Sequence, residues 1–264
     1  MARGDADAAP RSAWTALERE LDAWGRAGRA ATLWWRDDDA SAPSPALGRL
    51  LDLAARHDKS LAVAVVPARA VPALGELLAS VPGHRVLQHG YAHANHAPPG
   101  ERAVELGGTR ERAALLADLA AGYARLGELF AAQLLPVMVP PWNRLSATLL
   151  EPLAALGYRT LSAFAARAEP ESAPGLRQIN CHVDIIDWRG SRGFRGEARV
   201  LEQLCAHLRA RRLGEADAEE PTGLLTHHLD HDDACWDFLD RLLARTHAHP
   251  AARWLDATSA CLAP

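Results

Sequence analysis

The sequence predicts an α/β fold in which seven or eight β-α units form a parallel barrel. Segments with strand character alternate with helical segments along most of the chain. Residues 61–66 are continuously apolar, as expected of a strand covered on both faces. Four short polar clusters each follow an apolar run. In parallel barrels the chemistry gathers at the carboxyl ends of the strands, where we expect these clusters to meet.

The amino-terminal part of the chain predicts a helix outside the barrel. Residues 13–24 carry apolar side chains three and four positions apart. We expect residues 1–29 to form a tail and a helix packed on the barrel, and residues 30–264 to form the barrel domain. Residues 30–35 predict the first strand. Residues 44–57 predict the first barrel helix, with Ser44 as its cap and Pro45 in its first turn.

The same alternation predicts the remaining elements in order. Further strands are expected at residues 61–66, 85–88, 135–139, 159–162, 177–183, 223–226 and 253–255. Further helices are expected at residues 71–79, 110–130, 147–156, 198–211 and 234–245. Residues 97–109, 165–175 and 214–221 are predicted surface loops, the first of which is either a lid or a plain connector.

Composition narrows the classes of partner. The net charge of −4 and the absence of a basic stripe give no reason to expect nucleic acid or an anionic membrane as a partner, so a small neutral or polar substrate fits better. No apolar run reaches the roughly 20 residues of a membrane span. Residues 1–12 lack the pattern of a secretory signal, which predicts a cytoplasmic protein. The four cysteines are spread singly, which favours reduced, mostly buried thiols. The oligomeric state is not predicted.

The first two polar clusters point to a metal ion. Neighbouring carboxylates repel one another in Asp37-Asp38-Asp39, and a cation relieves this repulsion, although a solvated turn is the competing interpretation. His89 and His93 can meet on one face if the chain turns helical after the preceding strand. Two imidazoles and one carboxylate make a three-ligand site with an open position.

The third cluster, residues 140–143, favours a substrate surface. Pro141 stiffens the strand exit, Trp142 offers a flat apolar face on which a sugar ring can stack, and Asn143 supplies a donor and an acceptor. A structural turn with a buried tryptophan is the alternative. His96 is expected either behind the metal ligands or facing the substrate.

The fourth cluster supplies acid and base groups. Asp184 and Asp187 close one apolar run, and His227 and His228 close another, so an orienting carboxylate and a proton donor are available. The acidic residues at 230–233 are expected to begin and cap the following helix.

The order Asp-Asp, His-x-x-x-His, Pro-Pro-Trp, Asp-x-x-Asp-Trp and Leu-x-His resembles that of the polysaccharide deacetylases with NodB homology, over residues 30–260. This resemblance implies a distorted (β/α) barrel. It also implies a divalent metal, commonly zinc, held by one aspartate and two histidines, and hydrolysis of N-acetyl or O-acetyl groups.

The resemblance assigns roles residue by residue. The implied metal ligands are Asp39, His89 and His93; the base is Asp38; the acid is His227, oriented by Asp187 or Asp184; and the substrate-binding residues are Pro141, Trp142, Asn143, His96 and Trp188. A shift of one position would make Asp37 the base and Asp38 the ligand. His228 is the alternative acid.

Two departures mark a divergent branch of the family. Val139 stands where relatives usually have an arginine that pairs with the base, and Gly90 replaces the usual serine or threonine. We therefore expect Arg36 or Arg144 to tune the base. The expected function is removal of an acyl group from a sugar or glycoconjugate precursor. Hydrolysis of another small C–N amide and non-catalytic carbohydrate binding are the alternatives.

Overall fold

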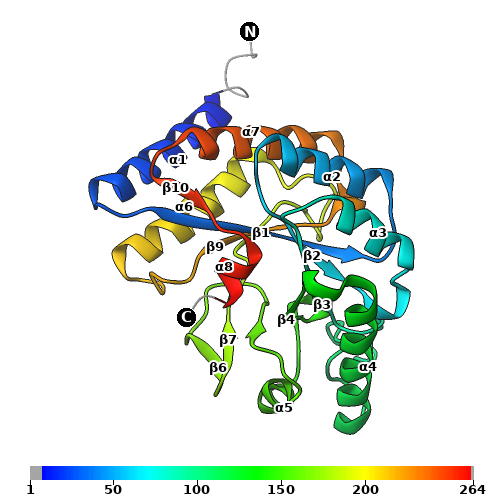
Figure 1. Cartoon of the computed structure of the whole chain (residues 1–264). Coiled ribbons are helices and arrows are strands. Elements are labelled where there is room, and N and C mark those ends of the chain that lie inside the picture. The colour runs from blue at the N-terminus through cyan, green and yellow to red at the C-terminus, as the bar shows by residue number, and fades with distance from the viewer. Residues whose placement is uncertain (1–7, 263–264) are drawn as a thin grey trace.

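A curled, mostly parallel β-sheet forms the centre of the computed structural model, which describes residues 8–262 (Figure 1). The strands are β1 (Ala31–Ala40), β2 (Ala62–Val65), β3 (Arg85–His89), β4 (Leu134–Val139), β5 (Thr160–Leu161), β6 (Glu171–Ala173), β7 (Leu176–Gln178), β8 (Val183–Asp184), β9 (Thr222–Thr226) and β10 (Ala252–Trp254). Their order is β6-β7-β5-β4-β3-β2-β1-β9-β8, with β10 beside the first half of β1. Only β6 is antiparallel to its neighbour among these strands.

One continuous segment, from β7 to β8, joins the two ends of this sheet. Its first half pairs with β5, an isolated bridge links Phe164 to Cys181, and its second half pairs with β9. The sheet therefore curls into a distorted parallel barrel, as predicted. The strand expected at residues 177–183 is interrupted where its partner changes from one side to the other.

Helices cover the outside of the sheet. They are α1 (Ala8–Arg26), α2 (Pro45–Arg56), α3 (Pro72–Ser80), α4 (Arg112–Phe130), α5 (Leu150–Ala155), α6 (Glu197–Leu213), α7 (Asp233–Ala248) and α8 (Ala257–Leu262). In Figure 1, α1, α2 and α7 lie on one side of β1, and α4 lies beside β3 and β4; α6 packs against α1. The predicted caps are confirmed: Ser44 accepts from the Leu47 amide at 3.0 Å, and Asp232 accepts from the Cys235 amide at 2.8 Å.

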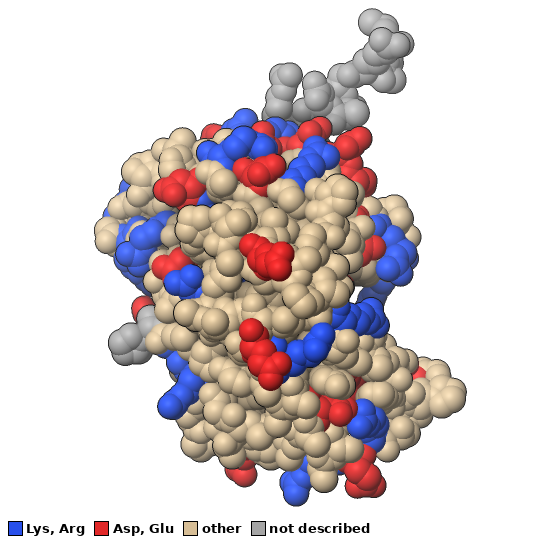
Figure 2. All heavy atoms as spheres, turned by 45° about the vertical axis from the view of Figure 1, so that its right-hand side comes forward, with Lys and Arg blue, Asp and Glu red and all other residues tan. Residues whose placement is uncertain are grey.

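The amino-terminal helix α1 packs against the outer helices α6 and α7. Trp14, Leu17, Leu21 and Trp24 are buried in the core that α1 shares with α6 and α7. Within the described chain no helix has the length and apolar character of a membrane span. Acidic and basic side chains are interspersed on the face seen in Figure 2, with no basic stripe across it.

Strand β1 carries Asp38 and Asp39 of the site and is longer than predicted. The expected end at residue 35 is wrong, because Arg36 and Asp37 continue to pair with β2 on one side and β9 on the other. Alternate residues of a strand face opposite sides. Trp34 packs inside the barrel and Trp35 packs against the outer helices, so Arg36 and Asp38 share the inner face with Trp34.

Other expectations are corrected by tertiary contacts. The chain does not turn helical after Gln88; residues 90–97 form turns and irregular backbone. The predicted loop at 165–175 contains β6, which pairs with β7 in a hairpin. The helix expected at 147–156 is a short 3₁₀ turn followed by α5, and α8 was not predicted.

Candidate active site

Three metal-binding side chains meet at the carboxyl end of the barrel. The Oδ1 atom of Asp39 lies 3.2 Å from Nε2 of His89 and 3.3 Å from Nε2 of His93. One ligand atom from each residue lies within 4.8 Å of the other two. Asp39 is 29% exposed, whereas His89 is buried. The arrangement leaves one open side toward a cavity, which suits a three-ligand metal site.

Backbone geometry, rather than a helix, brings these ligands together. The register between β1 and β2 shifts after Asp37, and Asp39 has a positive φ of 75°. His93 also has a positive φ, 56°. His89 ends β3, and its Nδ1 lies 3.0 Å from the carbonyl oxygen of Val139. Donation of the Nδ1 proton to that carbonyl leaves the Nε2 lone pair free for a metal.

A buried glutamate that sequence reasoning missed holds the histidine turn. The carboxylate of Glu105 accepts backbone hydrogen bonds from Tyr91 at 3.1 Å, Ala92 at 2.7 Å and Ala94 at 3.3 Å. Gly90 has a φ of +54°, and a Cβ atom there would overlap Glu105 and lie 2.6 Å from Cδ of Pro141. The glycine that departs from the family pattern is therefore required by this carboxylate. Glu105 lies in the predicted loop 97–109. The one sequence signal that could have revealed its role is that it is an isolated acidic residue among apolar neighbours.

Arg36 pairs with Asp38 through two parallel hydrogen bonds. Its Nε lies 2.9 Å from Oδ1, and one terminal nitrogen lies 3.0 Å from Oδ2. The same guanidinium donates to Asn143 Oδ1 at 2.8 Å and to the hydroxyl of Ser162 at 2.7 Å. Burial disfavours the cation, but the charge of Asp38 outweighs it and raises the pKa of Arg36. Of the two arginines expected to tune the candidate base, Arg36 is therefore the one that contacts Asp38.

The other candidate for that role points elsewhere. Arg144 donates to the carbonyl of Ala103 at 2.8 Å, and the side chain of Val139 packs inside the barrel. Arg36 reaches the Asp38 carboxylate because the two residues are two positions apart on β1 and both side chains face the barrel interior.

The Asp37 carboxylate lies on the opposite face of β1, where it is hydrogen-bonded to Thr226 and His228. It lies 2.5 Å from Nδ1 of His228 and accepts from the Thr226 hydroxyl at 2.7 Å and the His228 amide at 3.0 Å. Neither Asp37 nor His228 lines the cavity beside Asp39. The geometry therefore favours Asp38 over Asp37 as the candidate base and His227 over His228 as the candidate acid.

His227 faces the cavity beside Asp184. Its Nδ1 is buried and has no hydrogen-bond partner among the described residues, and the edge of Trp188 packs against its ring at 4.6 Å between centroids. Asp184 accepts from the Trp188 indole at 2.7 Å and from the Ile186 amide at 2.9 Å. Burial raises the pKa of Asp184, although the nearby charge of His227 opposes this.

Some expected site residues lie outside the cavity. The structure does not place Asp187 beside His227: Asp187 fills the turn that follows it, where a Cβ on Gly190 would overlap its carboxylate. Asp184 is therefore the better candidate for the orienting carboxylate, because it is the member of the pair that lines the cavity. His96 is also outside, with its backbone tied to Val104 and Thr109. Pro141 is buried beneath the cavity, against Gly90.

The cavity itself has a volume of about 590 Å³ and two aromatic walls. Trp142 has a φ of 54° and lies 4.3 Å from the His93 ring, and Trp188 is 38% exposed on the opposite segment. Further lining side chains include Phe164, Ile186 and the arginines 144, 189, 192 and 195. The last three follow β8 at intervals of three residues, a pattern that sequence reasoning missed.

Known structures share this architecture. A Mycobacterium smegmatis protein described as a polysaccharide deacetylase is 17% identical and has a TM-score of 0.62, with 87% of this chain and 88% of that one covered. The peptidoglycan N-acetylglucosamine deacetylase Bc1960 is 16% identical, with a TM-score of 0.56 and 87% of both chains covered. An acetyl xylan esterase of family 4 from Clostridium thermocellum, solved with a cobalt ion, is 14% identical, with a TM-score of 0.51 and coverages of 87% and 89%.

This chain has the polysaccharide deacetylase fold. No family model matches the sequence, and no curated protein matches it. At these low identities the likeness establishes the deacetylase fold alone. The candidate chemistry therefore depends on the side chains at the carboxyl end of this particular barrel.

Proposed function

We propose that this protein is a metal-dependent hydrolase that removes an acyl group, acetyl above all, from an N- or O-acylated sugar or glycoconjugate. The observation that carries the proposal is the convergence of Asp39, His89 and His93 beside Asp38 and His227 in one cavity. These are the residue types needed for metal-assisted hydrolysis with separate base and acid.

The donor set fits a divalent metal such as zinc. One carboxylate and two imidazoles are common ligands of zinc and cobalt ions. His89 is oriented by its contact with the Val139 carbonyl. Burial lowers the pKa of His93 despite the opposing charge of Asp39, so the His93 ring favours the neutral form that ligates. When bound, the ion supplies a Lewis acid for the acyl carbonyl.

The protein's own residues supply the proton transfers. Asp38, oriented by the two hydrogen bonds of Arg36, accepts the proton of the attacking water. The amide of Trp142 is the candidate donor to the oxyanion, because the two preceding prolines have no N–H. His227 then donates a proton to the departing amine or alcohol, with Asp184 beside it as the orienting carboxylate.

The cavity rim favours an anionic substrate. Arg189 has no ion pair among the described residues, whereas Arg192, which is 67% exposed, pairs with Asp230 at 3.7 Å and has its guanidinium 5.4 Å from the Trp188 ring. Guanidinium groups bind phosphate and carboxylate through paired hydrogen bonds. A phosphate or carboxylate near the acyl group of the sugar is therefore the candidate partner of Arg189. Replacing Arg189 with Ala should raise KM about tenfold for a substrate with such a group and leave KM for its neutral counterpart unchanged.

The decisive experiment measures bound metal and released acetate on the same preparations. We expect chelation to abolish acetate release and added zinc or cobalt to restore it. Asp39→Ala and His93→Ala should lose the metal, whereas the matched control His247→Ala, a surface histidine, should retain it. Normal metal content in both ligand variants would refute the assignment.

The acid and the two alternative functions are tested separately. His227→Ala should lower turnover about 10²- to 10⁴-fold with metal content kept. A full rate in that variant would remove His227 from the mechanism. A panel of acetylated sugars and small amides distinguishes a deacetylase from another C–N hydrolase. Sugar binding without acetate release would instead identify a carbohydrate-binding relative.

A further inference from the structure

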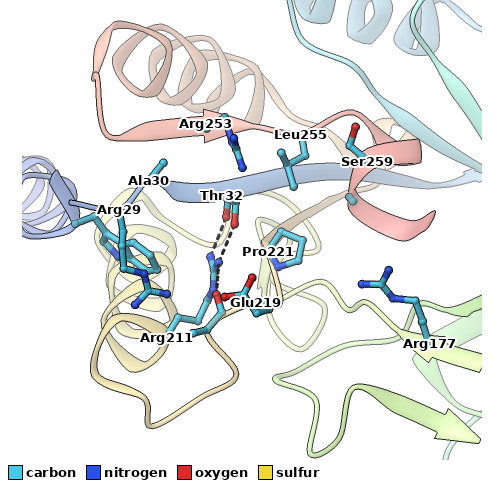
Figure 3. Close-up of a pocket in the computed structure, with 13 residues that line it drawn as sticks. Arg29, Ala30, Thr32, Arg177, Arg211, Glu219, Pro221, Arg253, Leu255 and Ser259 are labelled. Carbon is cyan, nitrogen blue, oxygen red and sulfur yellow. Dashed lines mark hydrogen bonds between the residues drawn. The ribbon is translucent and has the colours of Figure 1, made fainter. Parts of the chain in front are cut away.

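A second cavity lies at the opposite end of the barrel, beside the start of β1. Its volume is about 710 Å³, and its charged lining residues are Arg29, Arg177, Arg211, Arg253 and Glu219 (Figure 3). Thr32 lines this cavity and Asp38 lines the other, so six residues of strand, or roughly 20 Å, separate the two. This cavity is therefore distinct from the candidate active site.

Arg211 is a buried cation without a carboxylate partner. Its side chain is 1% exposed, and its terminal nitrogens make four hydrogen bonds: two to Thr32, at 2.9 Å and 2.8 Å, one to the Thr222 hydroxyl at 3.0 Å and one to the Ala218 carbonyl at 3.1 Å. None of the ion pairs of the described chain includes it, and its Nε is buried without any partner. Burial lowers the pKa of Arg211 to about 10. A buried charge of this kind is costly unless a counter-ion compensates it.

The other arginines converge on the same space from different elements. Figure 3 shows Arg253 reaching in from β10 and Arg177 from β7, on either side of the space beside Thr32. One terminal nitrogen of Arg177 is buried without a partner. Arg29 lies over the Trp24 ring at 4.7 Å, and Arg211 lies over the same ring at 5.2 Å. The tryptophan thus holds two guanidinium groups at one wall.

Nearby carboxylates leave this positive charge largely uncompensated. Asp217 is taken by Arg167, which donates to it at 2.9 Å and 2.7 Å. Glu220 accepts the backbone amides of Arg167 and Asn180, both at 3.0 Å, and lies 3.3 Å from Nε2 of His182, so its charge acts on Arg211 without a direct ion pair. Glu219 is the one acidic side chain among the described residues that line the cavity. Four guanidinium groups and one carboxylate leave an excess of positive charge.

We propose that this cavity binds a small molecule through a phosphate group that carries two or more negative charges. A single carboxylate would not balance the excess positive charge, whereas phosphate offers several oxygens to the unpartnered terminal nitrogen of Arg177, to the Nε of Arg211 and to the charges of the other arginines. The cavity volume falls within the 300–1,000 Å³ range typical of small-molecule sites. The ligand stabilises the amino-terminal end of the barrel by supplying the counter-charge that Arg211 lacks.

Calorimetric titration tests the proposal with three probes: inorganic phosphate, pyrophosphate and a nucleoside diphosphate. In metal-free buffer at about 0.15 M ionic strength, we expect at least one probe to bind with one-to-one stoichiometry. The strongest probe indicates whether the ligand is free phosphate or a larger phosphorylated compound. Binding of none of the three would overturn the proposal.

Single substitutions locate the bound phosphate. Arg177→Ala and Arg253→Ala, at the cavity wall, should each weaken binding about tenfold or more. The matched control Arg209→Ala, on the same helix as Arg211 but exposed, should bind as the parent does. Full binding by both cavity variants, or loss only in Arg189→Ala at the active-site rim, would refute the location. Melting temperatures of all variants show whether each is folded, so the test does not depend on replacing Arg211.

Discussion

Replacing Arg36 with methionine tests how this barrel holds its candidate base. Arg36 is fully buried and pairs with Asp38, itself only 2% exposed, through two hydrogen bonds. The substitution leaves the Asp38 carboxylate buried and unpaired. Removing one partner of a buried ion pair costs about 3–5 kcal/mol. We therefore expect the free energy of unfolding to fall by that amount.

The measurement is urea unfolding of the parent, of Arg36→Met, of Asp38→Asn and of the double variant. The double variant Arg36→Met/Asp38→Asn should cost less than the sum of the two single variants, with a coupling energy of about 1–3 kcal/mol. Arg110→Met is the matched control, because Arg110 forms a 2.6 Å ion pair with Asp118 at a surface position about one-third exposed. That variant should cost about 1 kcal/mol or less. Equal costs for Arg36→Met and Arg110→Met would refute the reasoning.

Three further predictions follow from single residues. In urea unfolding, Gly90→Ala should destabilise the protein by at least about 2 kcal/mol more than Gly100→Ala. Both glycines have a positive φ, but only at Gly90 would the added Cβ overlap neighbouring atoms. Equal costs would mean that backbone strain alone matters. Glu105→Gln should weaken metal binding about ten- to hundredfold in chelator competition, because it loosens the turn that carries His93, and unchanged affinity would argue against this support. Burial, reinforced by the charge of a neighbouring histidine, lowers the pKa of His207 from 6.5 to about 2, so its contribution to stability is present above pH 6.5 and is lost as the pH falls. Between pH 7 and pH 5, the free energy of unfolding of His207→Gln should therefore fall by about 2 kcal/mol less than that of the parent. An equal fall in the two proteins would contradict this.

The barrel could be predicted from the sequence because its signals are local. Continuous apolar runs separated by amphipathic helices specify strands covered on both faces, and Ser44 and Asp232 mark helix starts through their own side chains. The polar clusters could be assigned to the strand ends for the same reason. The likeness of the motif order to the polysaccharide deacetylases then indicated which of these residues to consider as ligands.

The precise end of β1 could not be predicted, because charged residues rarely continue a buried strand. Arg36 and Asp37 remain in the sheet because residues distant in sequence form hydrogen bonds with them. Arg36 donates to Ser162 and Asn143. Asp37 is hydrogen-bonded to Thr226 and His228. Such compensation has no local signature. It also decides which neighbour of each polar pair faces the cavity.

The amino-acid sequence by itself determined the succession of strands and helices and the chemical types available at the carboxyl end of the barrel. Only the tertiary structure decided that Asp184 rather than Asp187 lies beside the candidate acid, that Glu105 holds the turn of His93, and that arginines from α6, β7, β10 and the loop before β1 surround the second cavity. The physical reason is the distance in sequence over which each kind of interaction acts. Strand and helix signals act between near neighbours, whereas ion pairs and buried hydrogen bonds join residues that only the closed barrel brings together.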